Sequence, residues 1–170
     1  LNAKLEIVAS AALVHDLNYV FTDKLEPEAA DSQIKNYLHL AGFNDNNVKI
    51  ILETIENAHI GYRDNKKLSL ESQSLADGDT LFKALPITPI IFASRYLTQN
   101  SKNIGELAHK VVEEQEPLML KEKYFYTELA KSKYLKWAQA NLNMWKNVLE
   151  SLNDESVIEI LKNAKNLGVI

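Results

Sequence analysis

Two adjacent side chains, His15 and Asp16, have the types and the setting of metal ligands. They lie near the end of an apolar stretch, EIVASAALVHDL, which runs from Glu6 to Leu17. A helix that is apolar all round is typically buried, so we expect a core helix here, with both polar side chains half-buried at its end. Burying a carboxylate costs several kcal/mol unless the carboxylate is paired or binds a cation. A neutral His beside it can offer a nitrogen to the same cation.

A second carboxylate is predicted to lie on the buried face of a later helix. Ser69 is a typical N-cap and begins a helical segment, SLESQSLADGDTLFKAL. Within this segment Leu75, Asp79 and Phe82 are spaced i, i+4 and i+7, so they share one face. Asp77 is about 200° away around the helix, and we expect it to be the more exposed acid.

Together, His15, Asp16 and Asp79 offer one nitrogen and two carboxylate oxygens. Such a mixed set suits Mn, Fe, Mg, Ni or Zn rather than a soft metal. Without Asp79, the better interpretation of the pair would be a capped helix end with a satisfied core histidine. His39 and His109 lie in amphipathic segments without acidic partners from this set, and we interpret them as structural.

These residues resemble the signature of the HD-domain metal-dependent phosphohydrolases. The segment AALVHDL at 11–17 is similar to the family's His-Asp motif, and LADGDTL at 75–81 is similar to its closing Asp motif. The separation of Asp16 from Asp79, 63 residues, is also similar to the family's. Residues 124–152 resemble the long C-terminal helical region of the small bacterial members, so the resemblance covers most of the chain.

The resemblance implies a helical fold, a divalent metal ion (Mn, Mg, Fe, Ni or Zn) and hydrolysis of a small phosphate ester, such as a nucleotide. By this resemblance His15, Asp16 and Asp79 are metal ligands, and Asp16 also orients the attacking water. His59 is implied as a second-metal ligand or as an acid on the phosphate side; a cap on the last carbonyls of its helix is the alternative. The family's first His precedes the His-Asp pair, and this chain begins at Leu1 within a helical pattern. Either that helix lies upstream of Leu1 or the site is incomplete.

The charge of a phosphate substrate requires cations, and the chain has two arginines, Arg63 and Arg95. Arginine suits bidentate phosphate binding. Lys83 is a further candidate, together with Lys66 and Lys67. Ordinary surface ion pairs are the alternative interpretation of the two arginines.

All the elements that must position these residues are predicted to be helices. Apolar residues recur at helical spacing along the chain, and no alternating strand pattern occurs. Besides the two segments above, we expect helices from Pro27 to Gly42, from Asp45 or Asn46 to Ala58, from Thr88 or Pro89 to Tyr96, from Ile104 to just before Pro117, from Ala130 to Leu152 and from Val157 to Gly168. We therefore predict an all-α fold of about seven helices in a single HD-like domain, residues 1–170. Residues 119–170 form a C-terminal helical extension packed on its core.

Composition restricts the class of protein. Hydrophobic residues make up 46% of the chain and charged residues 25%, which is typical of a soluble globular protein. The formal charge of −4 does not favour nucleic acid as a partner. The chain has no cysteine, which excludes thiolate chemistry and fits a cytoplasmic location. No apolar run approaches the roughly 18 residues of a membrane span, and we expect no signal peptide.

Two other functions remain open at this point. A degenerate HD domain would bind a nucleotide or a partner as a regulatory module without turnover. A purely structural helical domain would use the helix at 124–152 as a partner surface. Trp137 and Trp145, eight residues apart on that helix, are interpreted as core or as an interface such as that of a homodimer.

Overall fold

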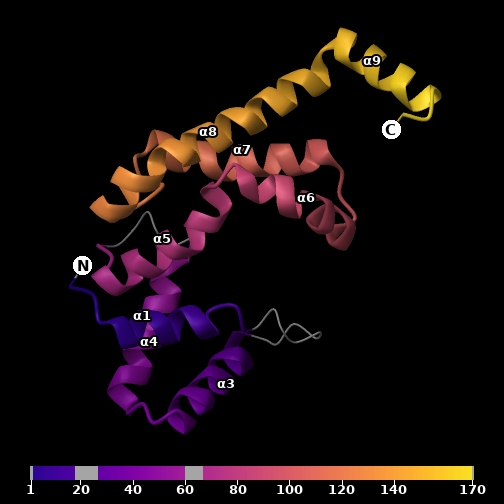
Figure 1. Ribbon diagram of the computed structural model, residues 1–170. Helices are drawn as coiled ribbons and strands as arrows, with labels where there is room; N and C mark the ends of the chain where they lie inside the picture. Colours follow the sequence, from indigo (N-terminus) through magenta and orange to yellow (C-terminus); the bar gives the residue numbers. More distant parts are fainter. Residues whose placement is uncertain (1, 18–26, 60–66, 170) are drawn as a thin grey trace. The chain divides into compact units, whose positions relative to one another are not determined.

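The computed structural model describes residues 2–17, 27–59 and 67–169, in which every regular element is a helix (Figure 1). The helices are α1 (Leu5–Val14), α3 (Pro27–Leu40), α4 (Asp45–Ala58), α5 (Leu70–Ala84), α6 (Ile87–Asn100), α7 (Ile104–Leu120), α8 (Glu128–Asn153) and α9 (Glu155–Asn166). The prediction of an all-α fold is confirmed, with eight helices in the described residues against about seven expected.

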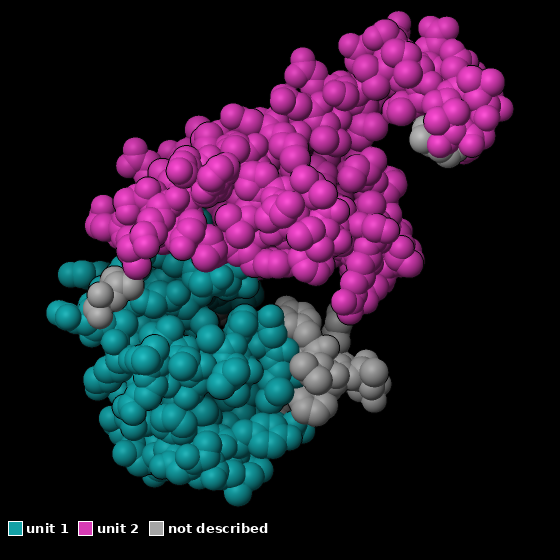
Figure 2. Space-filling view, viewed as in Figure 1, with its two compact units in different colours: residues 1–79, 125–127 teal, residues 80–124, 128–170 magenta. Residues whose placement is uncertain are grey.

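The chain forms two compact units, which Figure 2 distinguishes by colour. Unit 1 comprises residues 1–79 and 125–127, and unit 2 comprises residues 80–124 and 128–170. The boundary therefore falls within α5, immediately after Asp79. All three predicted metal ligands belong to unit 1.

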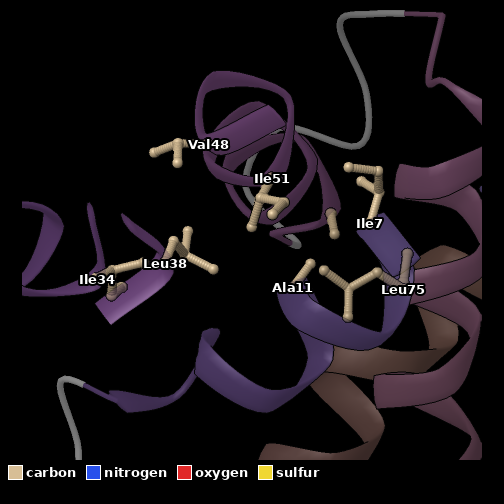
Figure 3. Close-up of a cluster of buried hydrophobic side chains, with 9 residues drawn as sticks. Ile7, Ala11, Ile34, Leu38, Val48, Ile51 and Leu75 are labelled. Atoms are coloured by element: carbon tan, nitrogen blue, oxygen red, sulfur yellow. The ribbon is translucent and has the colours of Figure 1, made fainter. Parts of the chain in front are cut away.

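Unit 1 is held together by one apolar cluster, to which α1, α3, α4 and α5 all contribute (Figure 3). Its buried members are Ile7, Ala11, Ile34, Leu38, Val48, Ile51, Ala58, Leu75 and Ala76. The spacing of Val48, Ile51 and Ala58 is the helical stripe expected for α4, whose first turn is capped by the side chain of Asn44. Burying a side chain such as Ile51 stabilises the fold by about 1.5–3 kcal/mol relative to leaving it exposed.

The prediction that α1 is buried all round is wrong. Ile7 and Ala11 are fully buried, but Leu5 and Leu13 are 80% and 83% exposed. Each exposed leucine is two positions, or about 200°, away from a buried neighbour, so only a narrow stripe of α1 faces the core. An apolar sequence therefore did not dictate burial on every side.

The start of α1 is tied to the start of α5. The backbone N–H of Lys4, which precedes α1, donates to Oε1 of Glu71 over 3.1 Å. This hydrogen bond lowers the pKa of the Glu71 carboxyl. Further along the two helices, Ile7 and Ala11 share the apolar cluster with Leu75. Together these contacts bring the His15 end of α1 toward Asp79 on α5, within unit 1.

Unit 2 is built on α8, which packs along α7 and carries α9 beyond its end (Figure 1). Leu107, Ala108 and Trp145 are the buried members of one apolar cluster in this unit. Helix α7 begins at a capping box between Asn103 and Glu106. None of the described helices combines the length and the apolar character needed to span a bilayer.

Helix α7 was expected to end before Pro117, but it continues to Leu120. Proline at this position removes one helical hydrogen bond, the one that the carbonyl of Glu113 would accept. Other contacts hold the segment, since the buried side chain of Gln115 accepts a hydrogen bond from the Tyr124 hydroxyl over 2.9 Å. A proline close to the end of a helix therefore did not mark its boundary.

Helix α9 is expected to lose its N-terminal cap in acid. The carboxylate of Asp154 accepts from the side chain and the backbone N–H of Ser156 and from the N–H of Val157, which holds its pKa below the ordinary value. A carboxyl whose pKa is depressed by folding stabilises above its unfolded pKa, and this stabilisation is lost as pH falls through the folded pKa. Amide exchange at Ser156 and Val157, corrected for intrinsic rates, should accelerate over that range.

The substitution Asp154→Asn is the matched control for this cap. Asparagine is an equally good N-cap but has no titrating carboxyl. Protection of the two amides should therefore remain in the variant and lose its dependence on acid pH. The same pH dependence in Asp154→Asn would contradict the assignment.

Candidate metal centre

His15 is the C-cap residue of α1, and its imidazole is oriented by its own helix. Nδ1 lies 2.8 Å from the carbonyl oxygen of Ala12. Because a carbonyl can only accept, Nδ1 carries the proton in this contact. In the neutral ring Nε2 then holds the lone pair, and this is the tautomer that metal-binding histidines commonly adopt. The side chain is 27% exposed, so its partial burial agrees with the sequence prediction.

Two carboxylates face this nitrogen. One belongs to the adjacent residue, Asp16, and the other belongs to Asp79 on α5. Nε2 of His15 lies 3.3 Å from Oδ2 of Asp16 and 4.0 Å from Oδ1 of Asp79. The Asp79 side chain is 35% exposed, whereas that of Asp16 is 65% exposed and not half-buried as expected. The structure therefore brings together the three residues that the sequence singled out.

The expectation that Asp77 is the more exposed acid of α5 is wrong. Asp77 is only 6% exposed, whereas Phe82, assigned to the buried face, is 52% exposed. The Asp77 carboxylate accepts from the backbone N–H of Tyr126 at 2.7 Å and from that of Thr127 at 2.8 Å. The Thr127 hydroxyl adds a third hydrogen bond at 2.7 Å. These donors satisfy the buried charge without a metal ion, so Asp77 has a structural partner.

Gly78, between the two acids, should be replaceable by alanine with a gain in stability. It is an exposed residue inside α5, and a Cβ built there would meet no atom within 4 Å. Alanine in a helix interior is favoured over glycine by about 0.5–1 kcal/mol. Urea denaturation of Gly78→Ala should show a gain of this size. A loss of stability would mean that the position needs glycine for another reason.

The other predicted site residues that the structure describes lie on other elements than His15 and Asp16. His59 is the exposed C-cap residue of α4, where its backbone N–H donates to the carbonyl of Glu56. Lys83 and Arg95 are exposed residues of unit 2, on α5 and α6 respectively. Arg63, like Lys66, lies outside the described residues. The roles assigned to these side chains remain predictions.

A second His-Asp contact in unit 1 provides an internal comparison. Nδ1 of His39 lies 3.1 Å from the carbonyl oxygen of Phe43, and Nε2 lies 3.6 Å from Oδ1 of Asp45. The local geometry resembles that of His15 with Asp16, but the Asp45 side chain is fully exposed. His39 thus pairs with a surface acid, and the structural role expected for it stays a prediction.

The donor types at His15 suit a divalent cation. Ligand atoms at about 2.0–2.2 Å from one ion lie about 3.0–3.5 Å apart, so the Asp16 contact fits and the Asp79 contact must shorten slightly. In the part of the chain that is described, no three His, Asp or Glu side chains are already arranged to hold a metal ion. These residues therefore supply two ligand pairs that share one nitrogen, and further ligands would have to complete the coordination.

Comparison with known proteins found no match to any family model, curated protein or solved structure.

Proposed function

We propose that this chain is an HD-type metal-dependent phosphohydrolase that acts on a small phosphate ester such as a nucleotide, in the cytoplasm. One observation carries the proposal: Nε2 of His15 faces both Asp16 and Asp79. A nitrogen and two carboxylates, drawn from segments 63 residues apart, are the ligand types expected for a hard or borderline divalent ion.

The three side chains have distinct tasks in this proposal. His15 would offer Nε2, because Nδ1 is held by the Ala12 carbonyl. Asp79, partly buried, would supply negative charge from the second helix. Asp16 is the most exposed of the three, so its carboxylate can accept a hydrogen bond from an attacking water and orient it. A bound divalent ion would lower the pKa of such a water and polarise a phosphoryl oxygen.

The phosphate itself requires positive charge. Arg63, Arg95 and Lys83 remain the residues proposed for this task, with His59 proposed as a second ligand or as an acid. Arginine would contribute a bidentate grip and lysine a point charge.

Metal-dependent turnover tests the proposal. The wild-type chain would be assayed with p-nitrophenyl phosphate, its bis ester and a panel of nucleoside monophosphates, each with Mn²⁺, Ni²⁺, Mg²⁺ or Zn²⁺ and with chelator. His15→Ala should abolish the activity, and His39→Ala, which removes the comparable surface histidine, should retain it. If no ester in the panel is hydrolysed faster with a metal ion than with chelator, the proposed enzymatic activity is wrong. Binding of a phosphate compound without turnover would support the regulatory module instead.

A further inference from the structure

The buried hydrogen bonds of Asp77 lie on the opposite side of α5 from the candidate metal site. Both carboxylate oxygens are engaged, by the N–H groups of Tyr126 and Thr127 and by the Thr127 hydroxyl, all within 2.8 Å. Phe125, which precedes these residues, is 1% exposed, so the segment that supplies the donors is itself firmly buried. Three short hydrogen bonds to one carboxylate make this a fixed point on the helix.

Asp79 follows Asp77 by two residues and therefore points about 200° away around the axis. A side chain about 5–6 Å from the helix axis moves by about 2 Å when the helix rotates by about 20°. Such a rotation would carry the Asp79 carboxylate out of reach of His15, which is now 4.0 Å away. Metal sites need their ligands held to within about 0.5 Å.

Apolar packing by itself only weakly restrains the rotation of α5 about its own axis. Leu75 and Ala76 bury the preceding turn of α5 in the core, but apolar contacts are not directional. Gly78, immediately before Asp79, has open space around it. The hydrogen bonds of Asp77 therefore place a directional restraint on the helix two residues before Asp79.

We propose that Asp77 is a positioning residue: its hydrogen bonds to residues 126 and 127 set the rotation of α5 so that Asp79 faces His15. For metal binding the inference rests on the proposed function. For the geometry of the His15–Asp79 pair it stands by itself.

The Thr127 hydroxyl allows a mild test of this role. Thr127→Val removes one donor and nearly preserves the volume, whereas Thr127→Ser keeps the donor. Mn²⁺ affinity, measured by calorimetry, should fall about tenfold in Thr127→Val, the effect typical of losing a hydrogen bond that orients a ligand. Thr127→Ser should restore wild-type affinity. If Thr127→Val does not fold, Thr127→Ala, which leaves no extra methyl group in the site, takes its place.

A second readout works without metal. The NMR signals of the His15 imidazole report on the nearby carboxylates, and they should shift in Thr127→Val and return in Thr127→Ser. Val48→Ala serves as the control, because it truncates the core of the same unit on α4 and leaves the hydrogen bonds of Asp77 in place.

The outcomes separate this inference from the proposed function. Unchanged His15 signals in Thr127→Val, or equal losses of Mn²⁺ affinity in Thr127→Val and Val48→Ala, would overturn the positioning role. A wild-type chain that binds no Mn²⁺ would overturn the proposed function, and the His15 signals would still decide whether Asp77 orients α5.

Discussion

Replacing Asp79 by asparagine should abolish stable binding of a divalent metal and, with it, phosphatase turnover. The change preserves the shape of the side chain but exchanges a charged carboxylate for a neutral amide, which removes one negative charge and one ligand oxygen from the site. A loss of at least about 100-fold in metal affinity is expected, since even residues that only orient ligands are worth 10–100-fold. Elemental analysis of protein purified in the presence of Mn²⁺ or Ni²⁺ measures the resulting loss of bound metal.

Asp45→Asn is the appropriate control for this variant. Asp45 also contacts a histidine through a carboxylate oxygen, at 3.6 Å, and belongs to the same unit. Metal content should be unaffected there, because His39 meets this acid at the surface. If both asparagine variants keep their metal, the ligands lie elsewhere.

The structural-domain alternative predicts a different result for Asp79→Asn. On that view the Asp79 carboxylate is a partly buried charge that binds no metal ion. Its neutralisation should leave metal content unchanged and raise the free energy of unfolding slightly. Measuring metal content and stability on the same sample therefore decides between the two functions.

Sequence reasoning identified the acid that faces His15, but the stripe argument used for it was wrong. Helical spacing shows which residues share a face; it does not show which faces the rest of the fold covers. On α5 the structure covers the side of Asp77, through residues 126 and 127. These donors lie about fifty positions later in the sequence, and no local sequence pattern indicates that they contact Asp77. The order of the His-Asp pair and Asp79 was the more reliable signal.

The helices themselves were predictable because local physics sets them. Ser69 begins its helix as expected, accepting from the backbone N–H of Ser72 over 3.1 Å. The grouping of helices was not predictable in the same way. Ile51 and Trp145 both lie in amphipathic stripes, but they belong to separate apolar clusters, one in each unit. The periodicity of an apolar stripe does not show which other helix it packs against. The division into two compact units therefore could not be predicted from periodicity.

The two tryptophans of α8 should differ sharply in their contribution to stability. Trp145 is 4% exposed in the core cluster of unit 2, whereas Trp137 is 46% exposed. Eight residues correspond to about 80° around a helix, which is enough to take one ring out of the core. Trp145→Ala should cost about 3–5 kcal/mol, the usual range for deleting a fully buried aromatic side chain. Urea denaturation followed by far-UV circular dichroism measures it without relying on tryptophan emission.

Trp137→Ala provides the matched comparison on the same helix. Its exposed ring lies 5.0 Å from the Lys136 ammonium, a contact worth about 0.5–1 kcal/mol at an exposed site. If the chain is a monomer, Trp137→Ala should therefore lower the free energy of unfolding by about 1 kcal/mol or less. A larger loss, with stability that rises with protein concentration, would show that a second copy covers Trp137, since association stabilises the folded state by mass action. That result would turn the proposed homodimer into a specific interface on α8, while leaving the core role of Trp145 unchanged.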